Sequence, residues 1–170
     1  MLAPIRIVGE YECQVKRHAP RSRTRKARTM ARNDTVALTK SPNRLLGVIF
    51  GAVYLLVGLL GFAVTGGVDF FATEGGLLLG IFMVNPFHNI VHLLIGAALL
   101  IGGLSSVSAA KATNTTIGAA YLLVGLIGLF ISGDNPANIL ALNAADNVLH
   151  FASAILLLAA GLGVEQPQRR

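Results

Sequence analysis

The chain has 170 residues, of which 54% are hydrophobic and only 13% are charged. Because ordinary soluble domains carry about 25% charged residues, this composition excludes a disordered chain and argues against a soluble globular enzyme. The single cysteine, Cys13, excludes a disulfide framework and a cysteine-based zinc site.

The basic charge is concentrated at the N-terminus. Eleven of the fourteen Lys and Arg residues precede residue 45, and the run 21–28 has no apolar periodicity. Such a composition predicts a disordered basic tail over residues 1–40, within which Met30 is an alternative start site. Because each basic residue near anionic lipid gains roughly 1 kcal/mol, we expect this tail to contact the bilayer rather than to bind nucleic acid specifically.

Four apolar segments follow the tail. A membrane-spanning helix needs about 20 apolar residues, and candidate segments lie at 45–66, 77–104, 117–132 (extendable through Thr115 and Thr116) and 139–163. Turn and helix-breaking residues, including the stretch 105–116, separate them. The predicted fold class is therefore an all-α integral membrane protein with four transmembrane helices within residues 41–164, followed by a short tail at 165–170.

The flanking charges predict the orientation of these helices. The N-terminal tail, Lys111 and the C-terminal pair Arg169 and Arg170 carry the positive charge, whereas the other two loops carry only acidic residues. Because Lys and Arg concentrate on the cytoplasmic side, we expect both termini to be cytoplasmic. The expected location is the bacterial inner membrane.

An internal duplication is visible in the helices. Residues 51–61 (GAVYLLVGLLG) recur as 118–128 (GAAYLLVGLIG), with nine of eleven positions identical. Residues 85–92 align more weakly with 143–150, with Asn, Asn and His kept at the same spacing. The sequence therefore predicts two parallel repeats of a helical hairpin, 44–104 and 115–163, related by an axis along the membrane normal.

Small residues and a tyrosine form the matching face of both repeats. Small side chains allow helices to approach closely in lipid. The predicted packing residues are Gly47, Gly51, Tyr54, Gly58 and Gly61 in the first repeat and Gly118, Tyr121, Gly125 and Gly128 in the second. We expect them to pack inside the chain; the alternative is a seam in a homo-oligomer or with a membrane-protein partner.

A polar motif recurs in the second helix of each repeat. It consists of Asn85, His88, Asn89 and His92, and of Asn143, Asp146, Asn147 and His150, with each set on one helical face. Because Pro86 disfavours an uninterrupted helix, we expect Asn85 and Asn143 to be N-caps. Residues 77–84 and 139–142 would then be short interfacial or re-entrant segments.

The function of this polar layer is open to four interpretations. The leading one is a non-enzymatic structural or accessory role without a cofactor, in which the layer forms caps and interhelical hydrogen bonds. The alternatives are a proton-coupled or small-solute pathway, a Zn or Fe site built from His88, His92, Asp146 and His150, and haem bound by His92 and His150. No phosphate-binding glycine loop or His-Glu-x-x-His motif is present, which favours a protein that is not an enzyme.

The segments 54–58, 85–92 and 146–150 together resemble a family of small bacterial membrane proteins, common in actinobacteria and called domain of unknown function 4383. The resemblance covers residues 44–163. It implies four membrane spans and no established activity.

Overall fold

The structure, a computed structural model, describes residues 37–163 and residue 165. A short 3-10 turn, η1 (Leu38–Lys40), precedes four helices, which are α2 (Pro42–Gly61), α3 (Pro86–Ser105), α4 (Val107–Ile131) and α5 (Ala144–Leu162). Two short antiparallel strands, β1 (Gly76–Leu78) and β2 (Phe82–Val84), lie between α2 and α3. The remainder of the predicted tails, 1–36 and 166–170, lies outside the described residues.

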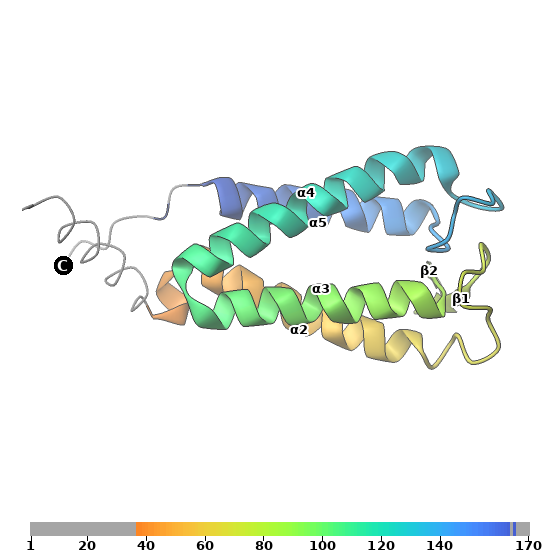
Figure 1. The fold of residues 1–170 in the computed structure, drawn as a ribbon, viewed down its shortest axis with the longest axis horizontal. Helices are drawn as coiled ribbons and strands as arrows, with labels where there is room; N and C mark the ends of the chain where they lie inside the picture. Colours follow the sequence, from red (N-terminus) through yellow and green to blue (C-terminus); the bar gives the residue numbers. More distant parts are fainter. Residues whose placement is uncertain (1–36, 164, 166–170) are drawn as a thin grey trace, which may run out of the picture.

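The helices form two antiparallel hairpins, α2 with α3 and α4 with α5, which lie side by side (Figure 1). The loops 62–85 and 132–143 lie at one end of the bundle, here called the loop end. The start of α2, the turn between α3 and α4, and the end of α5 lie at the opposite end, here called the junction end (Figure 1). Hydrogen bonds from Lys111 Nζ to Gly163 O and from Arg44 Nε to Gly103 O link the elements of the junction end.

Each helix begins at a residue whose side chain accepts a hydrogen bond from the first turn. The capping oxygens belong to Ser41, Asn85, Ser106 and Asn143. The two asparagines are the N-caps that the sequence predicted, and Pro86 occupies the first position of α3, where its missing N–H leaves no donor unsatisfied.

The prediction that residues 105–116 form a connector is wrong for most of this segment. Ser106 alone separates α3 from α4, and α4 begins at Val107 rather than near residue 115. The Ser106 side chain caps the new helix, and the alanines that follow favour helix. Lys111, the one charged residue in 105–116, donates a hydrogen bond to Gly163 O at the junction end. At 25 residues α4 is about 37 Å long.

The segments preceding α3 and α5 are not helical. Residues 76–84 form the β-hairpin, which turns at Leu79 and Gly80 with positive φ angles of 55° and 77°, as tight hairpin turns require. Residues 138–142 are irregular, and the Asn138 side chain bonds to Gly133 O and to both the N–H and the carbonyl of Leu142. The hairpin is the exception to the predicted all-α class.

The predicted glycine face packs inside the chain. A Cβ atom on Gly51 would lie 2.6 Å from Leu100 N, and one on Gly118 would lie 2.9 Å from Leu158 Cγ. The other members of the face, Gly47, Gly58, Gly61, Gly125 and Gly128, also meet a neighbouring helix of the same chain. The backbones of each hairpin therefore approach more closely than side chains at these positions would permit.

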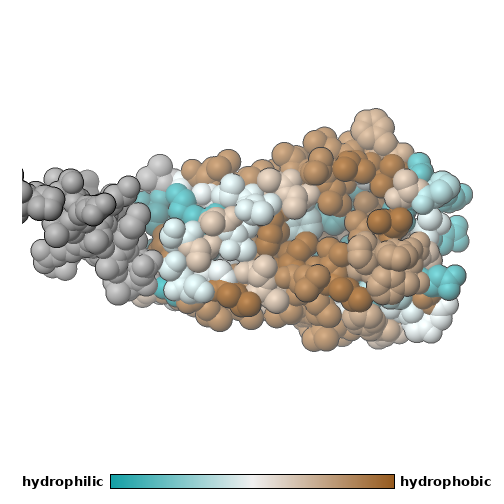
Figure 2. Space-filling model, in the orientation of Figure 1, coloured by the Kyte–Doolittle hydropathy of each residue, from teal (hydrophilic) through white to brown (hydrophobic). Residues whose placement is uncertain are grey.

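The face of the bundle shown in Figure 2 is mainly apolar between two more polar ends. Large side chains such as Leu59, Leu94, Phe130 and Leu162 are exposed. All four helices are long and apolar enough to cross a membrane. A contiguous apolar surface of this kind is typical of a protein that contacts lipid.

We predict that Gly51→Ala destabilises the bundle by about 1–3 kcal/mol, because the added methyl group meets the backbone of α3. The measurement is the thermal unfolding midpoint in detergent. Gly66→Ala is the control, since a Cβ atom there has no neighbour within 4 Å. Equal midpoints for the two variants would contradict the prediction.

Candidate functional site

Three buried histidines converge between the two hairpins. His88 and His92 come from α3 and His150 comes from α5. One ring nitrogen from each lies within 4.8 Å of the others. The ring centroids of His88 and His92 are 4.4 Å apart, and those of His88 and His150 are 6.1 Å apart. We call these three side chains the histidine cluster.

Local structure explains how α3 supplies two members of this cluster. Asn85 and Pro86 start the helix, so His88 lies in its first turn. His92 lies four residues further on and therefore on the same helical face. His150 is placed in the same way in the second turn of α5, which begins after Asn143.

Two tyrosines line the cluster on its junction side. The ring of Tyr54 lies 5.3 Å from His92, and the ring of Tyr121 stacks on His150 at 5.2 Å and 19°. The tyrosine rings also contact each other, with centroids 5.2 Å apart. These contacts restrict the orientation of two of the three imidazoles.

Most ring nitrogens of the cluster have no hydrogen-bond partner among the described residues. These atoms are Nδ1 of His88, both nitrogens of His92, and Nδ1 of His150, and all are buried. Buried polar atoms are normally hydrogen-bonded. The cluster therefore presents several nitrogen lone pairs or N–H groups that the described part of the chain leaves unused.

Asp146, a predicted metal ligand, is engaged elsewhere. Its Oδ2 accepts hydrogen bonds from Asn143 N at 2.9 Å and from Met83 N at 3.2 Å. The first bond completes a capping box with the Asn143 side chain. The structure thus brings three of the four candidate ligands together and places the fourth in a helix cap.

The capping asparagines link the two halves of the chain reciprocally. Asn85 Nδ2 donates to Ile139 O at 2.8 Å, and Asn143 Nδ2 donates to Ile81 O at 2.8 Å. Each cap of one hairpin therefore bonds to the loop of the other. These loops lie at the loop end, next to the first turns of α3 and α5 (Figure 1).

The remaining two asparagines pack against glycines. A Cβ atom on Gly61 would overlap Asn89 Oδ1, and one on Gly128 would overlap Asn147 Oδ1. The glycine hydrogen at that position points at the amide oxygen, the geometry of a Cα–H···O contact. Asn89 and Asn147 therefore join α2 to α3 and α4 to α5 by the same device.

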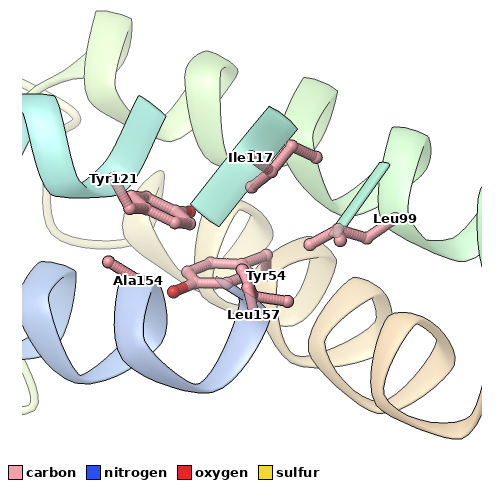
Figure 3. Packing of buried hydrophobic residues seen from close by; sticks show 6 residues of the cluster. All are labelled: Tyr54, Leu99, Ile117, Tyr121, Ala154 and Leu157. Atoms are coloured by element: carbon pink, nitrogen blue, oxygen red, sulfur yellow. The ribbon is translucent and has the colours of Figure 1, made fainter. Parts of the chain in front are cut away.

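An apolar layer lies on the junction side of the tyrosines. It consists of Leu99, Ile117 and Leu157, which are buried together (Figure 3). Along α4, Ile117 stands between Asn114 and Tyr121, which are seven residues or about 10 Å apart. The layer separates the histidine cluster from the polar groups of the junction end.

Three polar residues in this arrangement, Ser153, Asn114 and Asn43, were not among the predicted site residues. Ser153 Oγ and Tyr54 OH are hydrogen-bonded at 2.6 Å, and Asn114 Nδ2 donates to Asn43 O and Oδ1. The spacing of Ser153 three residues after His150 was a usable signal, since it places both on one face. Asn114 gave no such signal, because it fell in the segment predicted to be a connector.

The family model described as domain of unknown function 4383 matches residues 44–163. The chain belongs to this family. Comparison with curated proteins and with solved structures found no match. Because domain of unknown function 4383 carries no assigned activity, the function must be argued from the geometry of the site.

We predict that Tyr54→Phe and Ser153→Ala each destabilise the bundle by about 1 kcal/mol, because each removes the same buried hydrogen bond. The double variant should be no less stable than the worse single variant. Chemical unfolding in detergent measures the three values. Strictly additive losses would show that the two hydroxyl groups act independently.

Proposed function

We propose that this protein spans the bacterial inner membrane four times, with both termini in the cytoplasm and the loop end outside. The four apolar helices support insertion. The orientation is supported by Lys111, which bonds at the junction end, and by the exposed acidic residues Asp69 and Asp134 in the two loops of the loop end.

The orientation predicts opposite labelling of two introduced cysteines. In a background with Cys13→Ser, Asp134→Cys should react with a membrane-impermeant maleimide in intact cells. Ala112→Cys, next to Lys111, should react only after the membrane is opened. Both positions are exposed in the structure. A reversed labelling pattern would therefore show that the orientation is the opposite of the one proposed.

The bundle is a duplicated hairpin with an approximate two-fold axis between its halves. Supporting this are contacts between residues that the sequence repeat pairs. Asn85 and Asn143 are 58 positions apart, as are the residues they bond across the halves, Ile81 and Ile139 (143 − 85 and 139 − 81). The paired tyrosines, Tyr54 and Tyr121, meet each other between the two hairpins.

The role of the protein is non-enzymatic metal binding within the membrane. The histidine cluster binds one divalent first-row ion, Zn²⁺ or Fe²⁺, for which imidazole is a suitable ligand. The single observation that carries this proposal is that three buried imidazoles, with unpartnered nitrogens, gather within 4.8 Å of one another.

The spacing of the cluster suits such an ion after a small adjustment. Zn–N bonds of about 2.0–2.1 Å in a tetrahedron place two ligand nitrogens about 3.3 Å apart. The nitrogens here lie within 4.8 Å of one another, so binding would draw them together by at most about 1.5 Å. Three protein ligands leave a fourth position for water or another small ligand.

The same contacts favour an ion over the other interpretations. Hydrogen bonds among the histidines and Asp146, which a purely structural role predicted, would leave fewer unpartnered ring nitrogens. The apolar layer disfavours a continuous pathway for protons or solutes. A haem between His92 and His150 would have to displace His88, whose ring lies 4.4 Å and 6.1 Å from theirs.

We predict one bound ion per chain when the purified protein is titrated with Zn²⁺ or Co²⁺ by calorimetry. Substituting even an outer-shell partner weakens metal sites about 10–100-fold, so His88→Ala, His92→Ala and His150→Ala should each lose at least about 100-fold in affinity. A Co²⁺ absorption band should disappear in the same variants.

Two control variants sharpen this test. Asp146→Asn should retain the ion, because the Asp146 carboxylate lies in the capping box and not in the cluster. His18→Ala removes the fourth histidine of the sequence and should also retain it. Unchanged binding in all three cluster variants, or no binding by the wild type, would overturn the proposal.

A further inference from the structure

The histidine cluster is enclosed very differently on its two sides. Toward the junction end lies the apolar layer, in which Leu99 and Leu157 have no exposed surface. Helices packed backbone to backbone through glycines surround it. A divalent ion moving through this layer would lose its water without gaining any ligand, which is strongly unfavourable.

Toward the loop end lie irregular backbone and a short strand, and backbone groups of Leu140 and Met83 in them contact the His88 ring. Residues 81–84 and 138–143, here called the cover, include the buried side chains of Val84, Ala141 and Leu142. No turn of a helix has to unwind for the cover to separate from the bundle. Polar backbone groups in the cover also offer an ion transient oxygen ligands.

Three hydrogen bonds between the halves of the chain hold the cover in place, each joining a residue of the cover to the opposite half. Two are the reciprocal bonds from Asn85 to Ile139 O and from Asn143 to Ile81 O. The third runs from Met83 N to the Asp146 carboxylate. All three can break together when the two loops part, because each joins one half to the other.

The cover and its neighbouring turn contain strained backbone. Ala141 and Leu79 have φ angles of 53° and 55°, in the left-handed region that residues other than glycine rarely adopt. Such residues persist only where the surrounding structure imposes the conformation. The bonded state of the cover is therefore held against a local preference for another conformation.

We infer that the ion reaches and leaves the histidine cluster only from the loop end, by separation of the cover at the reciprocal Asn85 and Asn143 hydrogen bonds. This inference rests on the proposed metal site. It adds that the site exchanges its ion with one side of the membrane alone, the side on which the acidic loops lie.

The first experiment measures sidedness. Protein with Cys13→Ser and Asp134→Cys is loaded with Co²⁺ and reconstituted into liposomes, and labelling by an impermeant maleimide gives the fraction with the loop end outward. External EDTA should remove Co²⁺ from that fraction only, and detergent should release the remainder. Removal from both orientations, or only from molecules with the junction end outward, would overturn the inference.

The second experiment measures the rate at which EDTA removes Co²⁺ in detergent. Asn85→Ser and Asn143→Ser keep a capping hydroxyl but remove the amide donor that fastens the cover. Each should speed release about fivefold, the factor expected for one hydrogen bond. Ser106→Ala is the control, because it removes a cap at the junction end and leaves the cover intact.

The outcomes separate this inference from the metal site itself. If equilibrium titration detects no bound ion, both the metal site and the cover inference are wrong. If the ion binds normally but leaves at equal rates from Asn85→Ser, Asn143→Ser and Ser106→Ala, only the inference about the cover is wrong. Asn138→Ala provides a variant that loosens residues 133–142 without touching a helix cap, and it should also speed release.

Discussion

The constraint on which this structure depends is that polar groups inside an apolar bundle must find partners within the protein. Asn85 and Asn143 meet it by capping their own helices and bonding to carbonyl groups of the opposite loop. Asn89 and Asn147 place their amide oxygens against glycines, and these oxygens have no hydrogen-bond partner among the described residues. Four of the six ring nitrogens in the histidine cluster are likewise buried without a partner there, and three imidazoles with such atoms gather at one place.

Close packing of each hairpin decides where the larger side chains go. Glycines bring α2 against α3 and α4 against α5, so the bulky polar rings gather between the hairpins. The two halves carry different side chains at one aligned position of the polar motif, where the first has His88 and the second has Asp146. His88 adds a third imidazole to the pair His92 and His150, whereas Asp146 completes a helix cap. The first hairpin therefore contributes two imidazoles to the proposed site and the second contributes one.

The proposed function follows from this division between satisfied and unsatisfied groups. An ion bound by three neutral imidazoles would supply a partner for one buried nitrogen of each ring, and the apolar layer formed by Leu99, Ile117 and Leu157 would keep it from the junction end. The cover would then be the part of the fold that controls exchange. Its reciprocal asparagine bonds run between the halves, so they form only when both halves are in place.

Much of the fold could be predicted from local sequence signals. The four apolar segments, the caps at Asn85 and Asn143, and the glycine packing all follow from hydrophobicity, from side chains that bond to their own first turn, and from the absence of a Cβ atom. The start of α4 could not be predicted in this way, because the polar residues at 105–116 are typical of a loop. The partner of Lys111, the carbonyl group of Gly163, is brought near only by the fold. The histidine cluster, the bond between Tyr54 and Ser153, and the hydrogen bond from Met83 N to the Asp146 carboxylate were decided only by tertiary structure. Spacing along one helix determines which residues share a face, but the relative position of the two hairpins determines what that face meets.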